Sequence, residues 1–322
     1  MLSKLKEVYE KKYKILTVIT LMLLISFGGV LVYSKLTTGE FIKKDVSLKG
    51  GLLITISTDK TFNPMDLAKS LESELGVSVS VRGLKTVSGG NIGYSIEIEK
   101  LSDSSQAIPA IIKVTGIPLG QKDYTIEESS SALGESFFQS TLKTIGLAFL
   151  FMSIVVFFYL RQPIPSLAVI LAGFSDLIGT LAIMNIAGIK LSTAGVAALL
   201  MLIGYSVDSD ILLSARVLKG KEGTVLDRVY SSVKTGLTMQ STAIIALAVM
   251  WIVTPAALLK QIAMLLIIGL LLDVINTWIQ NVGILRLYLE NKEKHVQGEP
   301  RKGWNIFASL SRKNRGTQHE QG

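Results

Sequence analysis

Two adjacent stretches of the sequence decide the fold: residues 164–189 read IPSLAVILAGFSDLIGTLAIMNIAGI, and residues 191–213 read LSTAGVAALLMLIGYSVDSDILL. Each stretch is long enough to cross a bilayer, since a spanning helix needs about 20 mostly apolar residues. Four more apolar runs lie at residues 15–33, 142–160, 236–253 and 256–285. The sequence therefore predicts an α-helical membrane protein with six transmembrane helices.

The first run could instead be a cleaved signal peptide. Its C-terminal flank, Tyr33-Ser34-Lys35, lacks the small-x-small pattern of a cleavage site. We therefore interpret residues 15–33 as a retained membrane anchor.

The composition supports a membrane protein and excludes several other classes. Hydrophobic residues make up 49% of the 322 residues and the mean hydropathy is +0.46, which is too apolar for a soluble domain of this size. The net charge is +8, but the basic residues lie at the edges of the apolar runs without interleaved aromatic residues. We therefore expect no nucleic-acid partner. Cysteine is absent, both histidines lie in the C-terminal tail and no phosphate-binding loop motif occurs. We expect no metal site, no cofactor and no enzymatic activity.

The lysines and arginines predict the orientation, because basic residues in short flanks resist translocation. With a cytoplasmic N-terminus, the two short outer turns carry only Lys190 and Lys260, while more than half of the 33 basic residues flank the spans on the inner side. Both termini are therefore predicted to be cytoplasmic in a multi-pass protein of the cell membrane. The predicted order is a cytoplasmic N-terminus (1–14), a first span (15–33), an extracytoplasmic domain (34–140), a bundle of the other five spans (141–289) and a basic cytoplasmic tail (290–322).

The polar segment 34–140 predicts a separately folding α+β domain. Asn63 is a helix N-cap with Pro64 at the first helical position. Strands are expected at 52–57, 77–84, 92–99 and 123–127, helices at 64–75 and 103–114, and a hairpin connection at 88–91. The order β-α-β-β-α-β is that of a ferredoxin-like domain.

A pair of glycines, Gly50 and Gly51, precedes the first predicted strand. Glycine at a strand start indicates a close backbone approach or an unusual turn just above the membrane. A flexible entry into the sheet is an equally good interpretation of the pair.

Four aspartates interrupt the apolar spans, and they are the strongest functional signal: Asp176, Asp208, Asp210 and Asp273. A lipid-facing aspartate near the bilayer centre costs about 3 kcal/mol or more, so we expect these side chains to face the bundle interior or a water-filled cavity. Asp176 and Asp273 lie near the midplane and are the first candidates for proton or cation handling. The alternative is that all four serve as hydrogen-bonding groups that hold the helices together.

Helical periodicity arranges the polar residues of the sixth span on one face. They recur at i, i+3, i+4, i+7 and i+8, at positions 273, 276, 277, 280 and 281.

The aspartates of the fourth span lie about 200° apart around the helix, so they cannot share one partner. Ser206 lies on the side of Asp210. Gly204 lies on the side of Asp208, where it permits close helix approach. Arg216 ends this span and can reach the headgroups or pair inward with an aspartate.

The stretch AALLMLIGYSVDSD (197–210), followed by ILL and Arg216, resembles the SecF members of the SecD/SecF protein-export family, and the archaeal branch most. Gly204, Tyr205 and Ser206 belong to its most specific part. Supporting stretches are SLKGG (47–51), FSD (174–176), MQST (239–242) and NTW (276–278). The bacterial branch often has Asn-Asp-Thr where this chain has Asp-Ser-Asp at 208–210.

The resemblance implies a fold like one half of the resistance-nodulation-division transporters, with a SecD subunit supplying the other half. It implies a role in Sec-dependent export, in which the complex draws preproteins outward using the proton gradient. The implied partners are SecD, the Sec translocon, preproteins and membrane lipids. Candidates for coupling to protons or ions are Asp176, Asp273, Asp208, Asp210, Arg216 and Asn276, and the residues expected to serve packing are Gly50, Gly51, Gly204, Tyr205 and Ser206.

Two other functions remain open at this point. The chain could be a passive assembly or chaperone-like membrane subunit without proton coupling. It could also be half of an exporter of small molecules or lipids from the same superfamily, although the polar domain is too small to enclose a substrate path alone.

Overall fold

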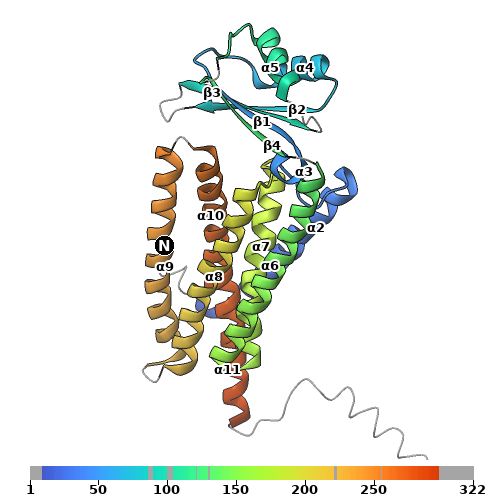
Figure 1. Ribbon diagram of the computed structural model, residues 1–322. Coiled ribbons are helices and arrows are strands. Elements are labelled where there is room, and N and C mark those ends of the chain that lie inside the picture. The colour runs from blue at the N-terminus through green and yellow to red at the C-terminus, as the bar shows by residue number, and fades with distance from the viewer. Residues whose placement is uncertain are drawn as a thin grey trace, which may run out of the picture.

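The computed structural model describes residues 9–85, 90–99, 104–120, 122–129, 131–220, 223–254 and 256–296. A bundle of long helices carries a small sheet domain at one end (Figure 1). The sheet domain is inserted between the first and second helices of the bundle.

The six predicted spans are confirmed, because six helices in the described part are long and apolar enough to cross a membrane. The sixth span is continuous but contains a π-helical segment, η1. The helices of the bundle are α2 (Tyr13–Thr38), α6 (Ser131–Leu160), α7 (Pro163–Ile186), α8 (Thr193–Lys219), α9 (Val225–Val253) and α10 (Ala257–Ile275), followed by η1 (Asn276–Asn281) and α11 (Val282–Val296).

Several helices extend beyond the apolar runs, since those runs mark only the part that matches the hydrocarbon core. Helix α6 already begins at Ser131, inside the predicted 34–140 segment. Helix α9 begins at Val225 rather than near 236, because Thr224 and Asp227 form a capping box there. Helix α7 instead ends before the predicted 189, and Gly188 follows it with a positive φ of 68°. Helix α11 continues to Val296 into the predicted tail, and the rest of that tail lies outside the described residues.

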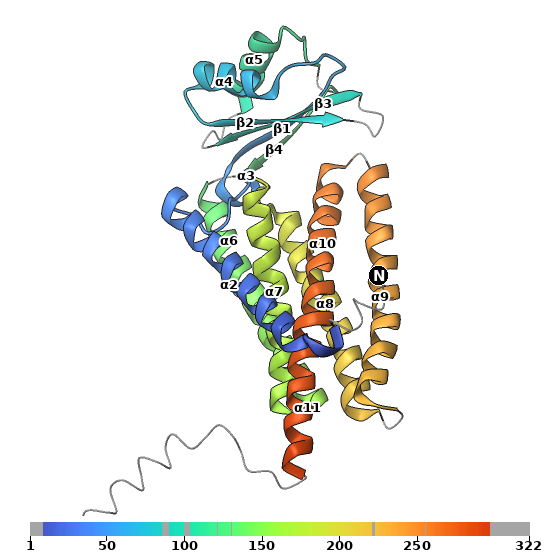
Figure 2. The same ribbon diagram turned by 180° about the vertical axis from the view of Figure 1, so that it is seen from behind.

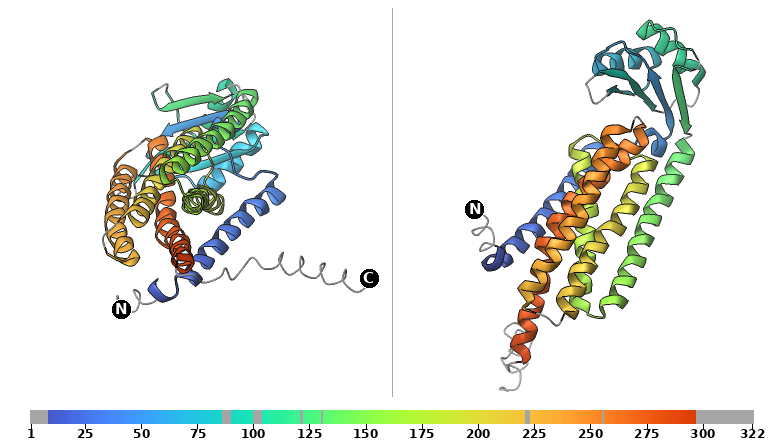
Figure 3. Two further views of the ribbon diagram at one scale, coloured as in Figure 1. Left: turned by 90° about the horizontal axis from the view of Figure 1, so that it is seen from below. Right: turned by 90° about the vertical axis from the view of Figure 1, so that its left-hand side faces the viewer.

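Helices α7 and α8 form the centre of the bundle, and the other helices surround them. About 60% of the spanning window of α7 is buried, against 11% for α6 and α9. Helix α2 crosses α7 and the sixth span at an angle (Figure 2), and viewed along the bundle α2 and α9 lie on opposite sides (Figure 3, left). The outer faces of α2, α6 and α9 expose large apolar side chains, as lipid-facing helices do.

The sheet domain has four antiparallel strands in the spatial order β2-β3-β1-β4. Its elements follow the predicted sequence order. They are β1 (Gly51–Ser57), α4 (Pro64–Leu75), β2 (Val79–Lys85), β3 (Asn91–Glu99), α5 (Ser104–Thr115) and β4 (Tyr124–Ser129). Both helices cover the face of the sheet that points away from the bundle (Figure 1). The predicted hairpin at 88–91 lies largely outside the described residues.

Alternation along the strands builds the core of this domain. Leu52, Ile54 and Ile56 of β1 are fully buried, and Ile54 lies opposite Ile96 and Ile126 of the flanking strands. The predicted helix start is confirmed, since the Asn63 side chain accepts a hydrogen bond from the Met65 N–H at 3.0 Å.

The two glycines at the start of β1 lie in unusual backbone conformations. Gly50 ends the short helix α3 (Val46–Lys49) with φ 87°, and Gly51 has φ 137°. A Cβ on Gly51 would collide with the carbonyl oxygen of Ile98, so this is the close approach that the first interpretation describes.

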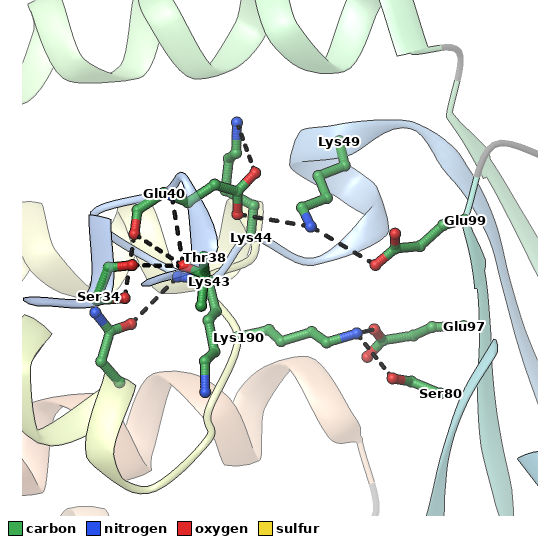
Figure 4. A network of polar contacts seen from close by, with 11 residues as sticks. Ser34, Thr38, Glu40, Lys43, Lys44, Lys49, Ser80, Glu97, Glu99 and Lys190 are labelled. Carbon is green, nitrogen blue, oxygen red and sulfur yellow. Dashed lines mark hydrogen bonds and ion pairs between the residues drawn. The ribbon is translucent and has the colours of Figure 1, made fainter. Parts of the chain in front are cut away.

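Charged side chains tie the sheet domain to the bundle (Figure 4). Lys190, in the loop between α7 and α8, lies 2.5 Å from the carboxylate of Glu97 and 3.0 Å from the Ser80 hydroxyl. Lys49 lies 3.6 Å from both Glu40 and Glu99. The junction between the domain and the bundle is therefore a network of ion pairs. We call it the junction network.

The backbone reinforces the same junction. The Asp45 N–H donates to the carbonyl of Leu191 at 2.9 Å, and the Leu191 N–H donates to the carbonyl of Lys43 at 2.7 Å. The segment before β1 and the loop between α7 and α8 are thus paired like two short strands.

Candidate functional site within the bundle

Asp176 lies in the middle of α7 and is completely buried. The Ser206 hydroxyl of α8 donates to one carboxylate oxygen at 2.5 Å, and the Asn276 amide of η1 donates to the other at 2.7 Å. This carboxyl therefore links three spans.

Asp273 lies at the end of α10 and is also completely buried. It accepts hydrogen bonds from Ser209 of α8 and Thr277 of η1, both at 2.8 Å, and from the Gln240 amide of α9. The indole N–H of Trp278 donates to the Gln240 side-chain oxygen at 2.8 Å and fixes the orientation of that amide.

Asp210 is the third fully buried carboxyl. The Asn281 amide donates to one of its oxygens at 2.7 Å, and the other oxygen has no hydrogen-bond partner among the described residues. Asp176, Asp210 and Asp273 together form what we call the carboxyl cluster.

Two serines of α8 connect two members of the carboxyl cluster, Asp176 and Asp273. Ser209 donates to the carbonyl of Ser206 at 2.9 Å as well as contacting Asp273, and Ser206 contacts Asp176. A hydroxyl can donate or accept and can rotate between the two roles. Asp176 and Asp273 therefore belong to one continuous polar network within the apolar bundle, and Asp210 lies beside it with Asn281 as its hydrogen-bond partner.

The polar stripe of the sixth span faces inward, as its periodicity predicts. The helix adopts π geometry there, which α-periodicity does not predict. The wider turn lets Asn276 reach α7 and Asn281 reach α8, while Thr277 bonds back to Asp273. Isolated π turns within α-helices often mark functional sites.

The prediction that all four aspartates face inward is wrong for Asp208. This side chain is exposed on α8, although it lies within a predicted span. The reason is geometric. Asp210 points into the bundle, and a separation of two residues along an α-helix turns the side chain of Asp208 to the opposite face. Gly204 and Tyr205 are exposed on the same face, which no described helix of this chain covers.

Arg216 pairs with no aspartate of the described residues. Its guanidinium donates to the Ser231 carbonyl at 3.0 Å and to the Thr235 hydroxyl at 2.9 Å, both on α9. The carboxyl cluster thus has no basic partner among the described residues.

Three donors of the site, Ser209, Gln240 and Trp278, entered the sequence analysis only as parts of family-like stretches and not as site residues. A lone glutamine in an apolar span is the signal that could have identified Gln240. The accompanying Gly236 is a second signal, because a Cβ there would collide with the Trp278 ring.

Outside the spans, burial raises the pKa of Asp45 to about 6, and the nearby Glu97 carboxylate adds to the rise. Asp45 precedes α3, next to the junction network. This group can therefore change its charge at mildly acidic pH.

The sequence resembles known export proteins over most of its length. The family model described as "Protein export membrane protein SecD/SecF, C-terminal" matches residues 113–291. The protein-export membrane protein SecF of Pyrococcus furiosus is 40% identical over 264 residues, which is 82% of this chain and 87% of the relative. SecF of Methanothermobacter thermautotrophicus is 39% identical over 286 residues, covering 85% of this chain and 90% of the relative.

The fold is similar to that of a solved structure. SecDF from Thermus thermophilus aligns with a TM-score of 0.68 at 17% identity over 87% of this chain, which spans 38% of the SecDF chain. A second SecDF structure, in the super-membrane-facing form, aligns with a TM-score of 0.52 over 89% of this chain and 39% of that chain. The chain therefore belongs to the SecD/SecF family of protein-export membrane proteins, on its archaeal SecF branch.

Proposed function

We propose that the chain is a non-enzymatic accessory subunit of the Sec export machinery, which works with a SecD partner and uses the proton gradient to promote preprotein translocation. The carboxyl cluster is the observation that carries this proposal. Its three carboxyls are fully buried, and their hydrogen bonds reach every span from the third to the sixth.

The cluster is suited to binding and releasing protons. Three negative charges in a dry interior without a basic partner would be very costly, so a cluster of this kind favours bound protons. A proton added to Asp176 can exchange donor for acceptor at Ser206, and a proton added to Asp273 can do so at Ser209 or Thr277. Because each of these groups bonds to a neighbouring helix, such an exchange would shift the helices relative to one another.

The exposed face of α8 supports the proposal that a second membrane subunit binds there. Asp208 would cost about 3 kcal/mol against lipid, so we infer that another protein covers it. Gly204 on that face leaves room for a closely packed helix. The chain spans 38% of the SecDF chain that it resembles, which leaves room for a SecD-type partner to supply the remainder.

We assign the inserted domain to the ferredoxin-like class and place it outside the cytoplasm, with both termini inside. The strand order β2-β3-β1-β4 with both helices on one face supports the class. The excess of basic residues at the opposite end of the bundle supports the orientation.

The test is translocation of a preprotein into vesicles that contain the complex, with and without an imposed proton gradient. Asp176→Asn and Asp273→Asn should each reduce the rate to the level seen without a gradient, since each removes a titrating group. One proton moving through 100 mV supplies about 2.3 kcal/mol. Losing the transfer of one proton should therefore lower the translocation rate measurably. Asp66→Asn, on the outer surface of the sheet domain, is the control and should leave the gradient response intact.

A passive assembly role is the second candidate, because the donors around Asp176 and Asp273 would also be expected of carboxyls that only hold helices together. It predicts that the gradient has no effect on the contribution of the complex. It also predicts that the Asn variants dissociate from the partner during size-exclusion chromatography. Intact complexes with full gradient-driven export from both Asn variants would refute proton coupling.

A further inference from the structure

A cavity of about 460 Å³ lies at the end of the bundle opposite the sheet domain. The start of α9 forms one wall and α11 forms the other, with Arg228 and Arg286 among the lining residues. Neither arginine takes part in the carboxyl cluster or in the junction network.

The two guanidinium groups have no acidic partner among the described residues. Arg286 is only 8% exposed, yet it donates to the neutral carbonyls of Tyr9 and Glu10, at 3.3 and 3.1 Å. Arg228 donates to the Gly220 carbonyl, and its Nε is buried without a hydrogen-bond partner in the described part of the chain. Two cations of this kind beside one cavity favour an anionic ligand.

One carboxylate opposes this charge. Glu290 also lines the cavity, but it lies 3.8 Å from the Lys14 ammonium and its side chain is 40% exposed. Lys14 and solvent reduce its repulsion, so the two arginines determine the sign of the site.

Three apolar side chains, Val225, Leu226 and Leu289, line most of the remainder, together with Gly223 and Thr224 at the start of α9. The cavity lies where α9 begins and where the last span, Leu258–Lys292, approaches its end. Arg286 directly follows the apolar run 256–285, which puts the cavity beside the inner edge of the spans, close to the phospholipid headgroups. Guanidinium groups bind phosphate through two parallel hydrogen bonds, while the apolar side chains suit the glycerol end of the acyl chains.

We infer that this cavity binds the phosphate of an anionic phospholipid headgroup. A free phosphate shares the same chemistry, so the experiment must separate the two sources. The inference does not depend on the proposed export function.

The full chain in detergent is titrated with dioctanoyl phosphatidylglycerol, dioctanoyl phosphatidylcholine or inorganic phosphate, and binding is followed by the shift in melting temperature. Phosphatidylglycerol should bind saturably and more tightly than the other two probes. Arg228→Gln should weaken that binding about tenfold, the effect expected from losing a hydrogen bond to a charged group. Arg161→Gln is the matched control, because Arg161 is an exposed arginine in the loop between α6 and α7 at the same end of the bundle.

Arg286→Lys provides a second variant that keeps the charge and loses the forked geometry, and it should weaken binding less than Arg228→Gln. Equal binding of inorganic phosphate and phosphatidylglycerol would overturn the lipid assignment. Equal affinities of Arg228→Gln and Arg161→Gln for phosphatidylglycerol would overturn the site itself.

Discussion

At the scale of single residues, Asp45 shows how burial turns an ordinary carboxyl into a titrating group. Its pKa rises from 3.8 to about 6, first because burial disfavours the charged form and then because Glu97 lies nearby. Lys190, which bonds to Glu97, offsets only part of this rise. The charge at the junction therefore changes near pH 6, above the ordinary range for an aspartate.

This pKa predicts the direction of a pH effect. A folded pKa above the unfolded value means that the folded state binds the proton more tightly, so stability falls as the pH rises from about 4 to about 6. At 1.36 kcal/mol per pKa unit, the loss for Asp45 is at most about 3 kcal/mol. Asp45→Asn should remove this contribution, so its melting temperature should fall less between pH 4 and pH 7 than that of the unsubstituted chain. Identical pH dependence in both proteins would contradict the prediction.

At the scale of helices, two glycines illustrate opposite environments. Gly236 of α9 faces the Trp278 ring of η1 so closely that a Cβ would collide with it. Gly204 of α8 has no atom within 4 Å of such a Cβ. The first glycine permits a contact within the chain, whereas the second is available to a neighbouring helix.

Gly236→Ala should therefore destabilise the chain by about 1–3 kcal/mol, the range found for overpacked cores. The displaced Trp278 would lose its bond to Gln240 and with it the support of Asp273. Gly204→Ala should raise the melting temperature of the isolated chain slightly, because Ala favours a helix interior over Gly by about 0.5–1 kcal/mol, but it should weaken association with the proposed partner. Thermal unfolding and co-purification of the two variants measure these effects, and equal thermal loss in both would show that the two environments do not differ.

At the scale of the whole molecule, the sheet domain and the bundle meet through the junction network. Lys190 and Glu97 form its most buried pair, with side chains 18% and 5% exposed. Removing one member of a buried pair leaves an uncompensated charge at a cost of about 3–5 kcal/mol. The attachment of the domain should depend strongly on this pair.

Lys190→Met should loosen the domain, because Glu97 would stay buried without its partner. Hydrogen exchange should increase in residues 41–57, where the chain enters the sheet. The double variant Lys190→Met, Glu97→Gln removes both charges and should recover part of the protection. No recovery in the double variant would mean that the charge of Glu97 is not the cause.

The sequence alone determined those features that local pattern controls. Apolar runs of bilayer length predicted six helices, and alternation with a capped helix at Asn63 predicted the order of the sheet domain. Periodicity also predicted the inward stripe of the sixth span, and it placed Asp208 and Asp210 on opposite faces of the fourth. These features depend on neighbours along the chain, so periodicity is sufficient to find them.

The tertiary structure decided which faces meet. The exposure of Asp208 follows from the absence of a described helix over its side of α8, which no pattern within the helix reveals. The π turn at η1 lies where Asn276 and Asn281 reach different neighbouring helices. The pairing of Lys190 with Glu97 joins segments that lie far apart in sequence. Contacts of this kind depend on the packing of whole elements in three dimensions, and a single sequence does not encode that packing in any local pattern.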